Sequence, residues 1–301
     1  MSIVRNLHNE TKKNTCFIVL MCYHAEVKIN WEDDNMKKIL AMLMAAALLL
    51  ALCACGNQAA SAQKRTSLIM GIDPEYPPFS YLGDDGGYTG FDVEVCKAVC
   101  DSLGWELKIF PVNWDEKLVQ LDSMEGDCIW SGMTILDTME EAGYVISKPY
   151  YDNSQVLVVK TDSGYASSAD LAGKVVAVQL GTSGEALLND SLADLAATFD
   201  SILTCDSFLK CFTELEGGAV DAVFVDLPVA ESYVAEHDGL TVINESLGAE
   251  QYGIAFRSGD GELCAQIDAA VQALVDSGAY AEIASNPKYS AIVNNLIFLN
   301  K

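Results

Sequence analysis

The sequence predicts an α/β fold with mainly parallel sheets, divided into two lobes. From Thr66 onward, short runs rich in β-branched and aromatic residues alternate with amphipathic windows, which is typical of strands joined through helices. The body that follows holds about 235 residues, more than one hydrophobic core usually takes. Polar and glycine-rich loops follow the expected strands, and ligand sites of α/β proteins gather at the carboxyl ends of strands. We therefore expect one cleft to collect these loops.

Strands and helices alternate along this body. Short β-rich runs bounded by turn residues predict the strands. The expected strands are Ser67–Ile72, Trp105–Phe110, Asp127–Trp130, Gln155–Lys160, Lys174–Gln179, Ala222–Val225 and Tyr252–Phe256. The expected helices are Phe91–Leu103, Ser183–Phe199, Ser207–Glu216, Pro228–His237 and Glu262–Ser277. Gly104 and Gly278 provide C-terminal stops for the first and last helix.

Composition excludes several classes of protein. Of the 301 residues, 50% are hydrophobic and 20% are charged, which is enough apolar material for a sizeable core and excludes intrinsic disorder. The net charge of −25 repels phosphate backbones, so we expect no nucleic-acid partner. The three His and ten Cys lack the close spacings of a zinc site. We therefore expect neither a metal nor a cofactor.

The first apolar run indicates export. Met36 and two lysines precede an uncharged run over residues 39–52, a profile typical of a secretory signal peptide rather than of a membrane span. Leu52, a small residue at 54 and Cys55 resemble the lipobox of bacterial lipoproteins, which implies cleavage before Cys55 and a diacylglycerol on its sulfur. The alternative is a buried helix that ends in a cysteine. We expect a protein held at the cell membrane by this lipid, on the extracytoplasmic side.

The N-terminal boundaries follow from this interpretation. Residues 1–35 show no periodic apolar pattern and are expected to be a spurious upstream extension. Residues 36–54 are the expected lipoprotein signal peptide. The small polar stretch that follows makes residues 55–65 the expected tether of a soluble body.

Six cysteines remain beyond the lipid site. They are Cys96, Cys100, Cys128, Cys205, Cys211 and Cys264. The first two are spaced i, i+4 on an expected helix beside apolar neighbours, where a buried small residue would lie. We expect free thiols that act as small core residues. A disulfide or redox role for some pair stays open.

Seven short motifs occur one after another along the body. They are Asp73-Pro-Glu-Tyr-Pro-Pro-Phe-Ser-Tyr81, Gly90-Phe-Asp-Val-Glu94, Ser131-Gly-Met-Thr134, Lys148-Pro-Tyr-Tyr151, Gln179-Leu-Gly-Thr-Ser-Gly184, Asp221-Ala-Val-Phe-Val-Asp-Leu-Pro-Val-Ala230 and Gln251-Tyr-Gly-Ile-Ala-Phe256. Together they resemble the polar-amino-acid family of bacterial solute-binding proteins over roughly residues 67–280.

The resemblance implies a type II periplasmic-binding-protein-like fold, in which two hinge strands join the lobes. Lobe 1 would comprise residues 66–153 and 252–301, and lobe 2 residues 154–251. The lobes would close on a small ligand, an amino acid or an amine, and present it to the permease of an ABC transporter. We expect a monomer with no enzymatic activity.

Two groups of the expected site would hold the charges of an amino acid. Asp226 matches the position where the family places a carboxylate for the ligand's ammonium, although Asp before Leu-Pro can also be the N-cap of the following helix. The loop from Gly181 to Gly184 links a strand to a helix, so its backbone N–H groups can hold an anion. Thr182 and Ser183 belong to this loop. An ordinary helix cap by Ser183 would give the same sequence.

Aromatic and polar residues would complete the site. Tyr76 and Trp114 match two positions whose rings sandwich the ligand in the family, although aromatic residues are more often simple core. Further ligand contacts are expected from Asp73, Ser131, Gly132 and Thr134 in the first lobe and from Gln179 in the second.

One departure from the family leaves the ligand open. Met139 stands where the family usually carries an Arg that binds the ligand carboxylate, and the exported part holds only Arg65 and Arg257. Either the ligand is still an amino acid, held by Thr134 and the loop amides, or it is a cationic or neutral amine-bearing solute.

Two other functions fit the same fold. The module could report its ligand to a receptor instead of a transporter, or it could be a dehydratase of cyclohexadienyl acids. The second needs a proton donor and a basic clamp for carboxylates, and the sequence offers no such clamp. The apolar segment from Ile292 to Leu299 is expected to pack on the first lobe as a last helix.

Overall fold

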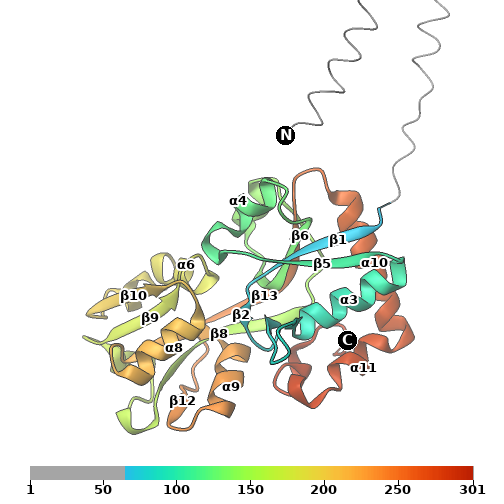
Figure 1. The fold of residues 1–301 in the computed structure, drawn as a ribbon. Helices are drawn as coiled ribbons and strands as arrows, with labels where there is room; N and C mark the ends of the chain where they lie inside the picture. Colours follow the sequence, from blue (N-terminus) through green and yellow to red (C-terminus); the bar gives the residue numbers. More distant parts are fainter. Residues whose placement is uncertain (1–64, 301) are drawn as a thin grey trace, which may run out of the picture. The chain divides into compact units, whose positions relative to one another are not determined.

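The computed structural model describes residues 65–300. The expected upstream extension, the signal peptide, Cys55 and all but residue 65 of the tether lie outside the described residues. A ten-stranded sheet runs through the described body (Figure 1). Its strands follow the order β10 (Ser201–Cys205), β9 (Val175–Gln179), β11 (Ala222–Asp226), β8 (Tyr151–Lys160), β13 (Gly248–Phe256), β6 (Cys128–Thr134), β1 (Ser67–Ile72) and β5 (Glu106–Pro111). Two short strands, β12 (Leu240–Val242) and β7 (Val145–Ile146), pair with β8 and β13.

The sheet has parallel wings and an antiparallel centre. Strands β6, β1 and β5 are parallel on one side, and β11, β9 and β10 are parallel on the other. Between them, β8 and β13 pair antiparallel from Gly248 opposite Gln155 to Tyr252 opposite Tyr151. These two strands extend from one wing into the other, as expected of hinge strands. We call the β1, β5, β6 side lobe 1 and the β9, β10, β11 side lobe 2. The residue limits predicted for the lobes stay a prediction.

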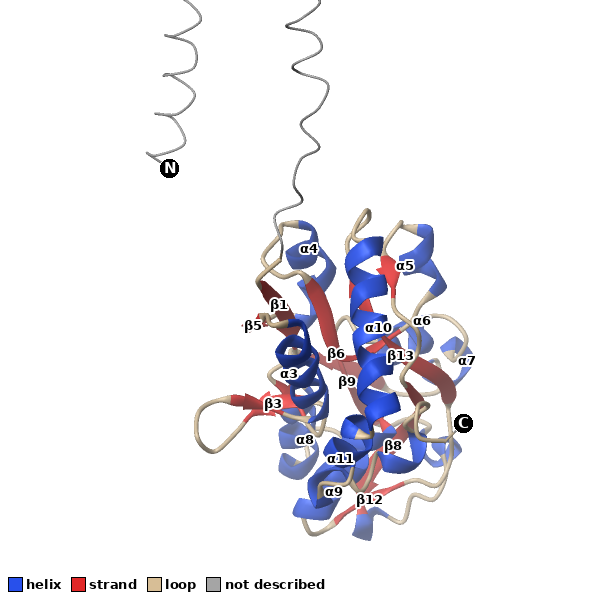
Figure 2. Ribbon diagram, turned by 90° about the vertical axis from the view of Figure 1, so that its right-hand side faces the viewer, coloured by secondary structure: helices blue, strands red, loops and turns tan. Residues whose placement is uncertain are grey.

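Helices cover the wings. In lobe 1, α3 (Phe91–Leu103) and α10 (Gly261–Ser277) pack side by side over the strands, with α11 (Ala279–Ala284) beside them (Figure 2). In lobe 2, α8 (Phe208–Gly217) and α9 (Leu227–Glu236) lie against the sheet. Helices α3 and α10 end where Gly104 and Gly278 take the left-handed conformation, as their sequences predict.

The predicted helix over 183–199 is wrong in its second half. The structure breaks it into α6 (Ser183–Asn189) and α7 (Ala193–Ala196). Asn189, Asp190 and Ser191 lie at the break, and these polar side chains favour turns and caps over helix interiors. The chain then forms the edge strand β10, which the sequence analysis missed because its side chains are mostly exposed and do not alternate in polarity.

Other short elements were also missed. They include the small sheet of β2 (Glu75–Tyr76), β3 (Ser80–Leu82) and β4 (Tyr88–Thr89), together with α4 (Lys117–Asp122), α5 (Asp137–Glu141), α11 and the short strands β7 and β12. Strands of two or three residues and helices of five or six leave too few residues to show a period.

The C-terminal segment packs as predicted but is not a helix. Val293–Asn295 form only a 3-10 turn. Leu296 is fully buried and forms an antiparallel bridge with Tyr151, and the amide of Ile297 donates to the carbonyl of Tyr150. Two adjacent asparagines and several β-branched residues disfavour an α-helix here. The segment therefore covers the beginning of β8 through apolar contacts and a backbone bond.

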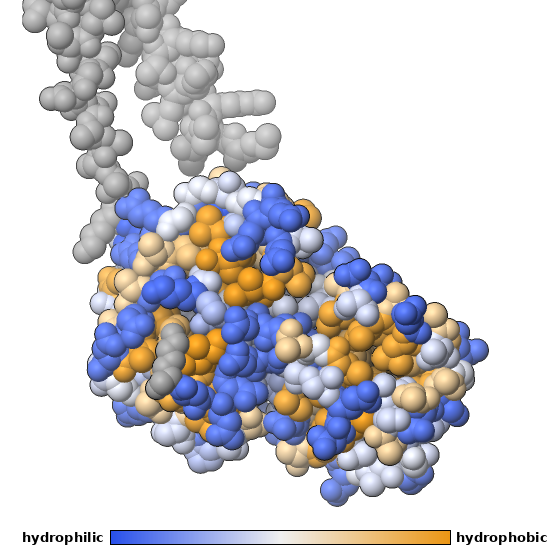
Figure 3. All heavy atoms as spheres, turned by 180° about the vertical axis from the view of Figure 1, so that it is seen from behind, coloured by the Kyte–Doolittle hydropathy of each residue, from blue (hydrophilic) through white to orange (hydrophobic). Residues whose placement is uncertain are grey.

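All six cysteines of the described body are buried and unpaired. Cys96 and Cys100 in α3 and Cys128 in β6 belong to the main apolar core. On the face seen in Figure 3, hydrophilic residues separate several apolar patches. Within residues 65–300, no helix is both long and apolar enough to cross a membrane.

Candidate ligand-binding site

A cavity lies where the two lobes meet. Its volume is about 40 Å³, room for about three water molecules. Eight of the ten predicted ligand contacts line it: Tyr76, Trp114, Gly132, Thr134, Gln179, Thr182, Ser183 and Asp226. The wall is completed by Lys117, Met133, Leu136, Met139 and Gly181. An amino acid needs more space than this, so the structure shows closed lobes that must part to admit a ligand.

Hydrogen bonds between the lobes support this closed arrangement. The Gln179 amide nitrogen donates to Asp73 Oδ2 at 2.8 Å, and the hydroxyl oxygens of Thr134 and Ser183 lie 3.1 Å apart. Gly181 permits the backbones to approach, since a Cβ there would lie 2.6 Å from the Cα of Asp115. The residues that line the cavity therefore also hold it shut.

Two parallel aromatic rings form one wall. Tyr76 in β2 and Trp114 in a 3-10 turn (Trp114–Glu116) have ring centroids 6.5 Å apart and planes within 8° of each other. Gly132 leaves room for the Tyr76 ring, because a Cβ at this position would lie 2.3 Å from Tyr76 Cε1. Gly132 also has φ of 53°, which favours glycine. Both predicted rings thus face the cavity.

Asp226 ends β11 and its carboxylate is buried in the polar network beside the cavity. Its Oδ1 accepts hydrogen bonds from Asn153 Nδ2 at 2.6 Å, Gln155 Nε2 at 2.7 Å and the Tyr252 hydroxyl at 3.0 Å. Asp226 occupies the N-cap position of α9, but its side chain makes no capping bond. Burial, followed by the charge of Glu250, raises the pKa of Asp226 to about 8.

Glu250 is a second carboxylate that the sequence analysis missed. Its Oε1 accepts hydrogen bonds from Asn153 Nδ2 at 2.6 Å, from Thr134 Oγ1 at 2.9 Å and from Gln155 Nε2 at 3.0 Å. Asp226 and Glu250 therefore share the amide nitrogens of two side chains and form one acidic cluster. Glu250 is two residues before Tyr252, so the alternation of a strand places both on one face. This two-residue spacing is the sequence feature from which Glu250 could have been found.

Lys117, the first residue of α4, was also missed. Its Nζ donates to the carbonyl oxygen of Gly181 in the other lobe at 2.7 Å and to that of Trp114 at 3.0 Å, and lies 4.8 Å from the Trp114 ring centroid. Burial lowers the pKa of Lys117 to about 8, although the carboxylates of Asp115, Asp73 and Glu185 act in the opposite direction. Lys117 is the one cation on the cavity wall among the residues described.

The loop between β9 and α6 is partly occupied by its own side chains. Thr182 caps α6 by accepting from the Glu185 amide at 3.2 Å, so the alternative of a cap by Ser183 does not hold. The Gly181 amide donates to Glu185 Oε2 at 2.8 Å. Ser183 Oγ instead joins the polar network and donates to Glu250 at 3.2 Å. Gly181 therefore does not offer the free N–H that the sequence suggested.

The structure does not bring Asp73 and Ser131 to the cavity wall. The Ser131 hydroxyl is fully buried, accepts from the Asp73 amide at 3.0 Å and lies 2.5 Å from Ser80 Oγ. Ser131 thus positions the loop that carries Asp73. Asp73 itself meets Gln179, and burial raises the pKa of its carboxyl. The ligand contacts predicted for these two residues stay predictions.

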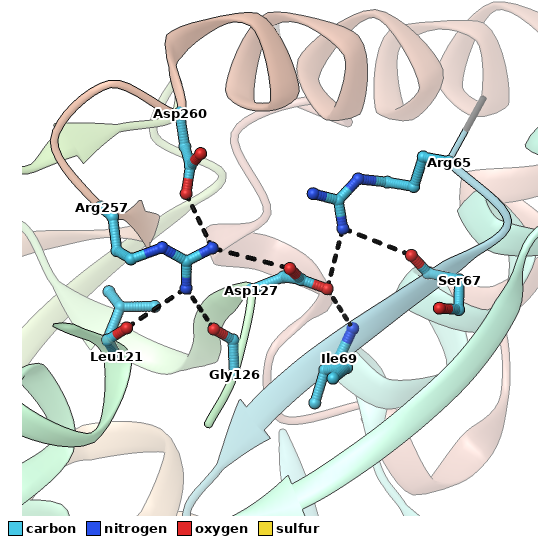
Figure 4. A network of polar contacts seen from close by, with 8 residues as sticks. All are labelled: Arg65, Ser67, Ile69, Leu121, Gly126, Asp127, Arg257 and Asp260. Atoms are coloured by element: carbon cyan, nitrogen blue, oxygen red, sulfur yellow. Dashed lines mark hydrogen bonds and ion pairs between the residues drawn. The ribbon is translucent and has the colours of Figure 1, made fainter. Parts of the chain in front are cut away.

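The two arginines of the described body lie away from the cavity. Both bind Asp127, as Figure 4 shows: Arg65 at 2.9 Å and Arg257 at 3.6 Å. Arg257 also pairs with Asp260 at 2.9 Å and donates to backbone carbonyls. These guanidinium groups fix the edge of lobe 1. Met139, at the position where the family usually carries an arginine, is buried on the cavity wall. Among residues 65–300, no guanidinium group lines the cavity.

Comparison with known proteins identifies the family. Residues 68–286 match the model of the bacterial extracellular solute-binding proteins, family 3. The chain belongs to this family. It is 33% identical over 219 residues to the L-cystine-binding protein TcyJ of Escherichia coli, covering 72% of this chain and 80% of the relative. It is also 33% identical over 248 residues to the arginine-binding extracellular protein ArtP of Bacillus subtilis, covering 81% of this chain and 94% of the relative.

Solved structures agree with this assignment. An ABC uptake transporter substrate-binding protein from Streptococcus pneumoniae with bound histidine superposes with a TM-score of 0.70 at 27% identity, over 72% of this chain and 90% of that one. The predicted two-lobed type II fold is thereby confirmed. The family comprises solute-binding proteins, in agreement with the function that the sequence indicated.

Proposed function

We propose that this protein captures a polar amino acid in the cavity between its lobes and delivers it to an ABC importer. The observation that carries the proposal is the Asp226–Glu250 cluster, whose Asp226 lines a closed cavity together with the Tyr76 and Trp114 rings. The relatives named above bind cystine, arginine and histidine, which all carry an α-ammonium.

The cluster supports an ammonium-bearing ligand on physical grounds. Burial and, after it, the charge of Glu250 raise the pKa of Asp226, so the two carboxylates cannot both ionise at low cost. An ammonium between them supplies both the missing charge and further N–H donors. Each charge-assisted hydrogen bond contributes about 1.5–3 kcal/mol.

The cellular setting belongs to the same proposal. A lipid on Cys55 would hold the protein at the extracytoplasmic face of the membrane, as the lipobox-like residues suggest. The monomer would pass its ligand to the permease and would have no catalytic role. The net charge of −25 and the acidic cluster disfavour the anionic substrates of a cyclohexadienyl dehydratase.

Calorimetry of the purified protein tests the proposal. We expect heat from at least one of L-arginine, L-histidine and L-cystine, and a loss of affinity of about 10- to 100-fold in Asp226→Asn. Asp101→Asn, an exposed position on α3, is the matched control and should leave affinity unchanged. Absence of binding to any amino acid would contradict the proposal, as would turnover of prephenate or arogenate.

A further inference from the structure

The ammonium of Lys117 lacks an ionic partner. Two of its three N–H donors are used by the carbonyl oxygens of Trp114 and Gly181, which are neutral acceptors. Within residues 65–300, no carboxylate oxygen lies within 4.0 Å of this nitrogen, although seven other cation–carboxylate contacts meet that limit. A partly buried cation that borders a cavity without a counter-ion favours an anion in that cavity.

The carboxylates nearest to Lys117 are already engaged or kept at a distance. Asp73 accepts from the amides of Gln179 and Glu75, and Glu185 accepts from the Gly181 amide. Asp115 lies on the same turn and acts on Lys117 only through its longer-range charge. The third donor of the ammonium thus has no partner among these side chains.

The cavity is dipolar. Lys117 lies at the Trp114 and Gly181 side, whereas Asp226 and Glu250 lie at the side of the hinge strands. Asn153, Gln155 and Tyr252 donate to the Asp226 carboxyl, whereas Lys117 donates to the carbonyl oxygens of Trp114 and Gly181. Leu136 and Met139 are apolar members of the cavity wall. This placement of opposite charges would suit the two charges of a zwitterion once the lobes part to admit it.

We propose that Lys117 binds the carboxylate of the ligand, while the Asp226–Glu250 cluster binds its ammonium. This inference rests on the proposed function. It separates the two ligand classes that the sequence left open, because an amine without a carboxylate would satisfy only the acidic side. Lys117 is thus a specificity-determining residue for α-amino acids over the corresponding amines.

A purely mechanical role for Lys117 is the competing explanation. The bond from its Nζ to the Gly181 carbonyl links lobe 1 to lobe 2 and could simply stabilise closure. A latch of this kind would affect every ligand equally. A carboxylate-binding group affects only ligands that carry a carboxylate, so matched ligand pairs distinguish the two roles.

The experiment measures affinities of the full chain for L-arginine against agmatine and for L-histidine against histamine, by calorimetry. For whichever pair binds, we expect the wild type to have at least tenfold higher affinity for the amino acid than for the amine. In Lys117→Met this preference should fall to threefold or less, with the affinity for the amine nearly unchanged. Lys117→Arg should retain the preference, and Lys97→Met, on the exposed surface of α3, should match the wild type.

The outcomes separate the inference from the proposed function. Equal losses for both members of a pair would show a latch, and an undiminished preference in Lys117→Met would show that another group binds the carboxylate; either result overturns the inference alone. Failure of the wild type to bind any of the four compounds or any other amino acid would overturn the proposed function.

A wild-type measurement checks the inference without a substitution. The preference for the amino acid should decline as pH rises above about 8, where Lys117 of the free protein loses its charge in the presence of Asp115, Asp73 and Glu185. Both members of a pair carry an amine, so the ratio of their affinities reports the contribution of the carboxylate to binding. A ratio that stays constant up to pH 10 would contradict the inference.

Discussion

Binding of an amino acid should release a proton from the acidic cluster. The pKa of Asp226 is about 8 because its carboxyl is buried and lies beside Glu250. A group with this pKa is about nine-tenths protonated at pH 7, and a ligand ammonium in contact with the cluster would leave both carboxylates ionised. We therefore expect the release of about 0.9 proton per site at pH 7.

Lys117 acts in the opposite direction. Its pKa of about 8 means that about one-tenth of the molecules hold it uncharged at pH 7, and a bound carboxylate would restore the proton. The net release is then about 0.8 proton at pH 7. The two contributions cancel near pH 8, and net uptake follows above it.

Calorimetry in buffers of different ionisation enthalpy measures this number directly. The slope of the logarithm of the association constant against pH gives the same number independently, since linkage requires the two to agree. Glu250→Gln keeps a hydrogen-bond acceptor in place but removes the charge beside Asp226, so it should lower the pKa of Asp226 and reduce the proton release. A binding enthalpy that does not depend on the buffer at pH 7 would refute the reasoning.

Two further predictions concern the cavity wall and its support. Gly132→Ala should destabilise the protein by about 1–3 kcal/mol and weaken ligand binding, because the added Cβ meets the Tyr76 ring. Thermal unfolding measures the loss of stability, and calorimetry measures the loss of affinity. Gly104→Ala is the control, since Gly104 has a similar φ but open space around it, and this substitution should leave ligand affinity unchanged. Asp92 accepts from the Gly132 amide and the Tyr150 hydroxyl, and burial raises its pKa from 3.8 to about 7. Protonation of Asp92 therefore contributes to the free energy of unfolding fully below about pH 4, and this contribution is lost as pH rises through 7. Asn cannot titrate, so in Asp92→Asn the fall in the free energy of unfolding over this pH range should be smaller by up to roughly 4 kcal/mol, as measured by denaturant titrations. A decline equal to that of the wild type would contradict the second prediction.

The sequence predicted the parts of the fold that show a clear local pattern. β1 and α3 have the predicted bounds because a short apolar run and a long amphipathic window each end at a turn or at a glycine. Tyr76, Trp114 and Asp226 meet at one cavity, although they are far apart in the chain, because each follows or ends a strand that points toward the same region. Their roles in binding remain proposals.

Lys117 and Glu250 could not be found in the same way. Lys117 follows Asp115 and Glu116, and such a run of charges is typical of a solvated face. Only the approach of Gly181 from the other lobe encloses its ammonium. Glu250 lies before the predicted start of a strand at Tyr252, whereas β13 begins at Gly248 and continues past both residues. In each case the contact that gives the residue its role comes from a segment distant in sequence.

The contacts of Lys117 connect recognition to closure. Its bond to the Gly181 carbonyl crosses from one lobe to the other, so the ammonium has its present position only when the lobes are closed. A ligand carboxylate on that ammonium would therefore interact more strongly with the closed form than with an open one, and differential affinity of this kind is what shifts a conformational equilibrium. A ligand ammonium at the cluster would act similarly, because Thr134 of lobe 1 and Ser183 of lobe 2 both donate to Glu250. A zwitterion that satisfies both sides should thus favour closure more than an amine or an acid alone.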